Sequence, residues 1–252
     1  MINAQVQLEQ LASIDSTNAE LLRRVQAGRR EPMAIYALAQ TAGRGRNGKS
    51  WDAPLLGLYY SQTFRFKCAP SKLAGLSLAL GIAAVEAIYA AMLPAHALAI
   101  RLKWPNDLWI NGEKLGGILI EMTPAPSKQS AKSTTVVAGI GVNLAGASDA
   151  MRTDLAAHGV ALAASALAPR MLDCWQQAAD QFSRKGFADF HSRWNELDAL
   201  AGKAVSLSDS PEQIWLASGV SDTGALKLHC AQRGERLVAS GEVSLSTRLI
   251  GS

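Results

Sequence analysis

Cysteine is scarce in this sequence of 252 residues, and its three cysteines, Cys68, Cys174 and Cys230, lie far apart. Their number is odd and none of them forms a C-x-x-C pair, so the sequence predicts neither a disulfide framework nor a zinc site. Unpaired thiols of this kind are typical of a protein in a reducing compartment. We therefore predict a cytoplasmic location.

The sequence also lacks a recognisable export or membrane segment. Residues 1–5 carry neither a basic start nor the apolar run of a secretory signal. The most apolar stretch, residues 73–93, is rich in alanine and is interrupted by Gly75, Gly81 and Glu86. We predict that it is a buried core helix and not a membrane span, and we expect no membrane partner.

Charge is moderate in amount and balance. Charged residues make up 18% and apolar residues 48% of the chain, the proportions of an ordinary globular protein. The net charge is +4 and the pI is about 9.0, which favours anionic ligands or an acidic partner over a dedicated nucleic-acid binder. The length suits one large domain with a small companion.

Hydrophobic patterning predicts a mixed α/β domain over residues 1–200 and a small β barrel over residues 201–252. Thr17 and Glu20 have the spacing of a capping box, so a helix of about ten residues is expected to start there. Asn111-Gly112 is a strong hairpin signal. The other expected elements are strands at 33–40, 58–66, 100–103, 108–110, 115–122 and 134–142, an exposed connection at 123–133, helices from about 170 to 200 and short strands at 203–252.

The most informative segment is Gly43-Arg44-Gly45-Arg46-Asn47-Gly48-Lys49-Ser50-Trp51. Its first six residues satisfy G-x-G-x-x-G, but no amphipathic helix pattern follows, as a dinucleotide fingerprint requires. The H-R-D and D-F-G motifs of a kinase are absent from the sequence. Neither a dinucleotide fold nor a kinase is therefore supported.

The physical properties of this glycine loop suit an anion. Glycines let backbone N–H groups approach a ligand closely, and Arg44, Arg46 and Lys49 bring three cations within six positions. A phosphate or a carboxylate would fit such a loop. The alternatives are a flexible basic turn without a ligand and a turn that contacts a nucleic-acid backbone. Trp51 is either a core residue or a surface on which a purine stacks.

A second group of candidates lies in Lys103-Trp104-Pro105-Asn106-Asp107. Asn106 and Asp107 are hard oxygen donors on a turn fixed by Pro105. A Mg²⁺ ion held mainly by nucleotide phosphates accepts ligands of this kind. The alternative is a solvated Asx turn.

Further candidates follow the expected hairpin. Lys114 opens a strand rich in glycine, and is either a surface lysine or a strand-end cation near a ligand. Gly139, Gly141 and Asn143 lie at the end of another expected strand. They indicate either a site of close approach, with an amide that reads a base edge, or an ordinary strand-ending turn.

Taken in order, these segments resemble the bacterial biotin protein ligases. The five segments that carry the resemblance are Asp15–Asn18, Gly43–Trp51, Lys103–Asp107, Lys114–Leu119 and Gly139–Asn143. The resemblance is strong over residues 13–143 and holds in outline for the C-terminal β region. It implies an α+β fold, with a core like that of class II aminoacyl-tRNA synthetases, a mixed sheet with flanking helices, and then an SH3-like β barrel.

The resemblance also implies a reaction. Biotin would attack the α-phosphate of Mg-ATP to form biotinyl-5′-AMP, and a lysine of the biotin carboxyl carrier protein of acetyl-CoA carboxylase would then take the biotin. Because this chemistry brings a carboxylate and a polyphosphate together, cations must screen the two anions.

Residue roles come from the same resemblance. The implied biotin site consists of Ser16, Thr17, Asn18, Gln40, Gly43, Arg44, Gly45, Arg46, Lys114, Gly117, Gly139 and Gly141. The implied ATP and adenylate contacts are Arg44, Arg46, Lys49, Trp51, Lys114 and Asn143, and the implied metal corner is Asn106 with Asp107. Lys114 and Arg46 are the expected catalytic residues.

The sequence departs from the family in two respects. Asn47 and Lys49 stand where the commonest family form has arginines, so we expect activity with altered retention of the adenylate. About a dozen residues precede Asp15, too few for the helix-turn-helix that some relatives carry, so DNA binding is not expected. A lipoate ligase of the same fold, a nucleic-acid-binding module, and a monomer or a homodimer stay open as alternatives.

Overall fold

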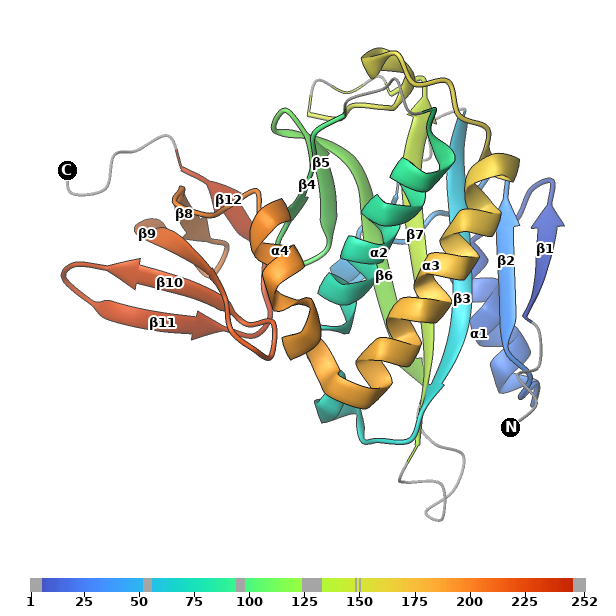
Figure 1. The fold of residues 1–252 in the computed structure, drawn as a ribbon, viewed down its shortest axis with the longest axis horizontal. Coiled ribbons are helices and arrows are strands. Elements are labelled where there is room, and N and C mark those ends of the chain that lie inside the picture. The colour runs from blue at the N-terminus through green and yellow to red at the C-terminus, as the bar shows by residue number, and fades with distance from the viewer. Residues whose placement is uncertain are drawn as a thin grey trace.

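The computed structural model describes residues 6–51, 56–93, 98–123, 133–147, 149 and 151–246. The larger part of the molecule is a seven-stranded mixed sheet with flanking helices, in the strand order β1-β2-β3-β7-β6-β5-β4 (Figure 1). Its strands are β1 (Gln7–Leu11), β2 (Met33–Ala37), β3 (Leu56–Phe66), β4 (Ile100–Lys103), β5 (Asp107–Ile110), β6 (Glu113–Thr123) and β7 (Thr134–Ala145). The helices are α1 (Thr17–Gln26), α2 (Leu76–Ala91), α3 (Ala164–Lys185) and α4 (His191–Leu197). β1 runs parallel to β2, and the other neighbouring strands are antiparallel.

The sheet buries side chains on both faces, and β2 shows how. Ala34 and Tyr36 belong to the large core that includes α2 and α3, whereas Met33 and Ile35 join a smaller cluster with residues of α1. In Figure 1, α2 and α3 lie in front of the sheet and α1 lies behind it. Side chains alternate between the faces of a strand, so burial on both faces explains the continuous apolar run in the sequence.

Helix α1 has the predicted length of ten residues, but its first turn differs from the prediction. The N-cap is Ser16, whose Oγ accepts a hydrogen bond from the backbone N–H three residues on, at 3.5 Å. Thr17 is buried, and both its backbone N–H and its hydroxyl donate to Gln40. Glu20 forms ion pairs with two arginines of the last helical turn. The capping-box prediction is therefore wrong, because both residues have partners elsewhere.

The predicted core helix is confirmed as α2. It follows Gly75, which has a φ of 82°, and most of its residues are buried. The stretch Pro70–Ala91 is long and apolar enough to cross a membrane by length and composition alone, but 67% of its most apolar window is buried inside the protein. This burial is what a core helix requires.

The helical region begins earlier than predicted, because α3 starts at Ala164 and continues through Pro169. Proline removes one backbone hydrogen bond, which the sequence pattern favours as a helix boundary. Ala168 and Met171, on either side of Pro169, are buried in the core, and Trp175 anchors the helix further along. Its side chain is fully buried, its ring centroid lies 5.4 Å from that of Tyr60, and its Nε1–H donates to the Leu80 carbonyl at 3.0 Å.

The predicted hairpin between β5 and β6 is confirmed. Asn111 and Gly112 form the turn with φ of 52° and 87°, and positive φ at both central residues is the pattern of a type I′ turn. The predicted connection after β6 falls mostly on residues 124–132, which lie outside the described residues, as do residues 52–55 after the glycine loop.

The C-terminal region forms a second, five-stranded sheet in the order β11-β10-β9-β8-β12. Its strands are β8 (Ala204–Leu207), β9 (Ser210–Val220), β10 (Leu226–Cys230), β11 (Gly234–Val238) and β12 (Val243–Leu245). Figure 1 shows this sheet at the left, beyond α4. Trp104 joins the two sheets, since its Nε1–H donates to the carbonyl of Gly224 at 3.0 Å.

The burial of Trp175 predicts a large effect of its removal. Trp175→Ala should lower the free energy of unfolding by about 3–5 kcal/mol, because it leaves a cavity between α3 and the sheet. Urea denaturation measures this change, and Gln177→Ala, at an exposed position of the same helix, is the matched control. A loss below about 1 kcal/mol would contradict this account of the core.

Candidate active site

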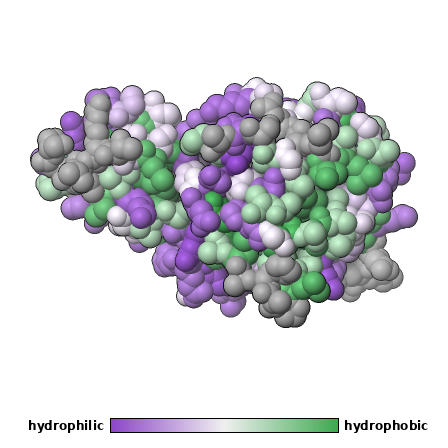
Figure 2. Space-filling model, turned by 90° about the horizontal axis from the view of Figure 1, so that it is seen from above, coloured by the Kyte–Doolittle hydropathy of each residue, from purple (hydrophilic) through white to green (hydrophobic). Residues whose placement is uncertain are grey.

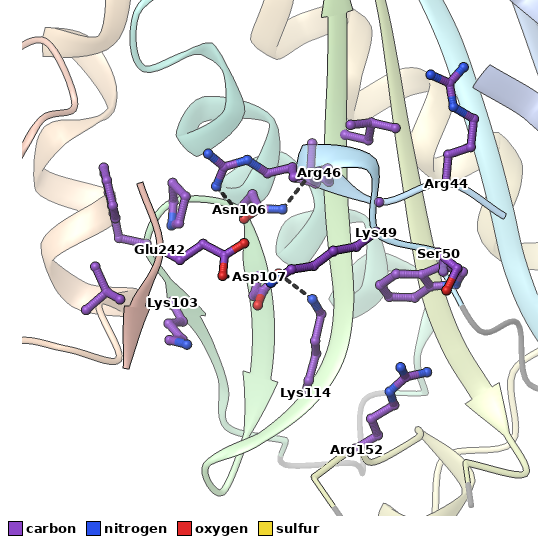
Figure 3. A pocket seen from close by; sticks show the side chains of 18 of the residues that line it. Arg44, Arg46, Lys49, Ser50, Lys103, Asn106, Asp107, Lys114, Arg152 and Glu242 are labelled. Atoms are coloured by element: carbon purple, nitrogen blue, oxygen red, sulfur yellow. Dashed lines mark hydrogen bonds and ion pairs between the residues drawn. The ribbon is translucent and has the colours of Figure 1, made fainter. Parts of the chain in front are cut away.

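A cavity of about 340 Å³ lies where the glycine loop, the end of the sheet at β5 and β6, and the C-terminal sheet meet (Figure 3). Figure 2 shows a constriction between the two parts of the molecule, with hydrophilic side chains gathered along it. The cationic residues that line the cavity are Arg44, Arg46, Lys49, Lys103, Lys114 and Arg152, and the acidic ones are Asp107 and Glu242. This excess of positive charge suits an anionic ligand.

The glycine loop Gly43–Trp51 folds back on itself in a hairpin-like turn. Arg44 and Ser50 form a β-bridge, and the backbone N–H of Trp51 donates to the carbonyl of Gly43 at 2.9 Å. At the tip Asn47 has a φ of 56°. A Cβ atom on Gly43 would lie 2.5 Å from the Trp51 carbonyl oxygen, so only glycine fits there. The cations of the loop therefore project from a compact, hydrogen-bonded turn.

Three cations of the cavity pair with carboxylates that come from separate elements. The pairs are Arg44 Nη2 with Glu121 Oε1 at 2.9 Å, Lys114 Nζ with Asp107 Oδ1 at 2.7 Å, and Lys49 Nζ with Glu242 Oε2 at 2.7 Å. The hydrogen bond from Lys49 lowers the pKa of Glu242 below its usual value. Arg46 instead donates to Asn106 Oδ1 at 3.2 Å and to the Gly241 carbonyl at 3.4 Å. Each cation is thus held without a bound ligand.

Asn106 and Asp107 lie side by side at the start of β5, facing the cavity. The Asn106 side-chain amide donates to the carbonyl of Ile118 at 2.8 Å, which orients its oxygen toward Arg46. Within the described residues there is no group of three or more His, Cys, Asp or Glu that could hold a metal ion. These two residues therefore offer only a partial ligand set, which fits a metal held mainly by the phosphates of a ligand.

Two strand glycines form a floor for the indole of Trp51. Gly117 of β6 pairs with Gly141 of β7 in the sheet, and a Cβ on Gly141 would lie 2.7 Å from the Trp51 ring. Two cations lie near the same ring, with Lys114 Nζ at 5.3 Å and Arg152 Cζ at 5.9 Å from its centroid. The flat ring and the adjacent charges provide a surface for a planar, negatively charged ligand.

A smaller cavity of about 30 Å³ lies beside the first, near the start of α1. Its polar lining residues include Ser16, Thr17, Asn18, Gln40 and Ser61. The residues that line both cavities are Arg44, Trp51, Gly117 and Leu119. The two cavities are therefore adjacent.

Hydrogen bonds arrange the polar residues of the smaller cavity. Ser61 Oγ donates to Asn18 Oδ1 at 2.6 Å and lies 2.8 Å from Thr17 Oγ1. Gln40 Oε1 accepts from the backbone N–H of Thr17 at 2.8 Å. A Cβ on Gly139 would lie 2.1 Å from Asn18 Oδ1, so the glycine leaves the room that the amide occupies. A buried array of donors and acceptors of this kind suits a small polar ring such as a cyclic urea.

Lys103 is a further cation of the large cavity. It ends β4 and is half-buried, and its Nζ lies 4.7 Å from the centroid of the Trp109 ring. Burial lowers the pKa of the Lys103 amine, and the nearby Asp107 carboxylate partly offsets this effect.

The structure brings most of the predicted site residues together, and Arg46 and Lys114 line the same cavity. The exceptions are Gly43, which shapes the loop, and Asn143. Asn143 is only 1% exposed, and its amide donates to the carbonyls of Thr153 at 2.9 Å and Lys114 at 3.4 Å. It therefore braces the backbone at Lys114, and its contact with adenine stays a prediction.

Several residues of the site were not found from the sequence. They are Ser61, Glu121, Arg152 and Glu242. Lys103 opens one of the candidate segments, but the sequence assigned no role to it. Period-two spacing could have found Glu121, since it shares a strand face with Gly117. Arg152 and Glu242 come from segments without a motif, so no local signal would have found them.

Several known proteins are similar to this chain. A model of the biotin/lipoate A/B protein ligase family matches residues 11–143. A biotin--[acetyl-CoA-carboxylase] ligase of Paracoccus denitrificans is 34% identical over 92% of this chain and 98% of its own length. The bifunctional ligase/repressor BirA of Escherichia coli is 33% identical over 86% of this chain and 68% of its own length.

A solved structure is similar over nearly its whole length. The biotin protein ligase of Aquifex aeolicus in complex with biotin and ATP has a TM-score of 0.73 and 27% identity, covering 95% of this chain and 98% of that one. These findings confirm the family resemblance drawn from the sequence motifs. The chain belongs to the biotin/lipoate A/B protein ligase family.

Proposed function

We propose that the chain is an ATP-dependent biotin protein ligase. It would form biotinyl-5′-AMP from biotin and ATP and then pass the biotin to a lysine of a biotin carboxyl carrier protein. One observation carries this proposal: the cations of the glycine loop and Lys114 line one cavity. Four residues of its lining also line the polar cavity at α1. The names of the similar proteins, ligases for biotin, support the same substrate.

Biotin would bind across the smaller cavity. Thr17, Asn18 and Gln40 would contact its ureido ring, which needs donors and acceptors on both sides. The ring would lie near Gly139 and Gly141, which line the smaller cavity. The carboxylate would then extend toward the residues that line both cavities.

ATP would bind in the larger cavity, with its purine near Trp51 and its phosphates near Arg46 and Lys49. In adenylation a biotin carboxylate oxygen attacks the α-phosphorus, and the bond to the β-phosphate breaks. Lys114 and Arg44 are proposed to stabilise the charge that develops there. Their present carboxylate partners support this role, because an entering anion can take the place of each one.

Asn106 and Asp107 would contribute ligands to Mg²⁺ bound with ATP. The ion supplies charge neutralisation at the phosphates when bound. The partial oxygen set at this corner fits such a role. Gly45 and the other loop glycines would let the loop order over the adenylate and exclude water.

Further parts of the proposal concern the fold and the surroundings. The core over residues 1–200 would be of the class II aminoacyl-tRNA synthetase type, and residues 201–252 would be an SH3-like barrel. The order of the strands in the two sheets supports this division. The proposal keeps the cytoplasmic location predicted from the sequence.

The direct test is ATP-dependent transfer of label to a carrier domain. The chain is incubated with ATP, a carrier fragment and either radiolabelled biotin or radiolabelled lipoate. We expect biotin to become an adenylate and then to label the carrier, and no label when the carrier lysine is replaced by arginine. Labelling with lipoate alone would favour the lipoate ligases. Salt-sensitive nucleic-acid binding without a thermal shift from biotin would favour a binding module.

The proposed roles of Lys114 and Arg46 predict a loss of rate. Lys114→Ala and Arg46→Ala should each slow adenylate formation by at least about tenfold, because each removes a cation from the reacting phosphate. Pyrophosphate release measures the rate, and Lys72→Ala, at an exposed lysine, is the matched control. Wild-type rates in both variants would contradict the site assignment.

The close contact at Gly139 predicts a loss of biotin affinity. Gly139→Ala places a methyl group on Asn18 Oδ1 and should weaken biotin binding by about tenfold or more, since the polar cluster must move. Calorimetric titration measures the affinity. In the control variant Gly81→Ala the new Cβ meets its nearest neighbour at an ordinary 3.4 Å. Unchanged affinity in Gly139→Ala would show that biotin binds elsewhere.

A further inference from the structure

Lys103 differs in its partners from four other cations of the large cavity. Arg44, Lys49 and Lys114 have carboxylate partners, and Arg46 has two oxygen acceptors. Among the described residues, the Lys103 amine has neither a carboxylate within ion-pair distance nor a hydrogen-bond acceptor. The amine lies over the ring of Trp109, 4.7 Å from its centroid.

This arrangement leaves the Lys103 amine partly desolvated and without an ion pair to any described carboxylate. A half-buried ammonium group loses part of its hydration, and an aromatic ring replaces only some of it. Lys103 is not needed for packing of the core. Its neighbour Leu102 is the residue that is buried there, whereas Lys103 lines the cavity. The Lys103 amine can therefore contact an anion that enters the large cavity.

The position of Lys103 indicates which anion this is. Lys103 lines the large cavity but not the small one. Its amine interacts electrostatically with four charged residues, which are Asp107, Lys114, Glu242 and Lys49. Figure 3 shows Lys103 on the side of the C-terminal sheet, with Arg152 on the opposite side. Lys103 thus lies away from both the polar ring site and the proposed purine surface.

We propose that Lys103 binds the β- and γ-phosphates of ATP and the pyrophosphate that leaves. This inference rests on the proposed function. The carboxylate oxygen forms the new bond to the α-phosphorus, and the bridging oxygen departs with its electron pair on the pyrophosphate. Lys103 stays protonated throughout and stabilises the departing charge. In the reverse step it holds pyrophosphate for attack on the adenylate.

The test compares ligands that do and do not carry these phosphates. In Lys103→Gln, affinity for ATP and for pyrophosphate should fall by about tenfold or more, while affinity for AMP and biotin stays as in the wild type. Transfer of biotin from preformed biotinyl-5′-AMP to the carrier should also be unchanged, since no pyrophosphate takes part. Lys67→Gln removes an exposed lysine and is the matched control for charge.

A structural role for Lys103 would give a different pattern. Equal losses for ATP, AMP and biotin, or unchanged affinity for ATP and pyrophosphate, would overturn the inference. Lys103→Met retains an apolar stem against Trp109, so it should show the same selective loss even where the glutamine variant folds poorly. If the wild-type chain makes no biotinyl-5′-AMP, the proposed function fails. A wild-type enzyme with unaffected variants refutes only the role of Lys103.

Discussion

Repulsion between like charges is the constraint on which this site depends. Six cationic residues line one cavity of about 340 Å³, and their mutual repulsion would separate them without compensation. The fold supplies carboxylates from β5, from β6 and from the C-terminal sheet, each within 3 Å of one cation. A bound anion can replace these carboxylates one by one. The proposed function requires these ion pairs to open when substrate binds.

The sheet can carry both a core and the two cavities because its two faces differ. One face is covered by α2 and α3 and carries the large apolar core. The other face is covered by α1 over β2 and β7, where Ile35 and Val137 are buried. Beyond that cluster the same face has Gly117, Gly139 and Gly141, whose lack of side chains leaves room for Trp51, Lys114 and Asn18 to pack against the backbone. The two cavities thus lie where this face of the sheet carries glycines in place of larger side chains.

Local features could be predicted from the sequence, and distant partners could not. The turn at Asn111 and the core helix α2 follow from residues adjacent in the chain. Ser16 replaced Thr17 as the helix cap because Thr17 bonds to Gln40, which lies 23 residues away. Glu242 reaches Lys49 across 193 residues, and no pattern in either segment encodes that pair. The motifs therefore located the site, whereas the fold determined its partners.

A structure with a non-hydrolysable sulfamoyl analogue of biotinyl-5′-AMP tests the central claim most directly. The measured quantities are the distances from Arg44 and Lys114 to the group that replaces the phosphate, and to their present partners. We expect both cations to contact the analogue, with the Arg44–Glu121 pair at 2.9 Å and the Lys114–Asp107 pair at 2.7 Å broken or lengthened. An analogue bound with both pairs intact and neither cation in contact would contradict the account.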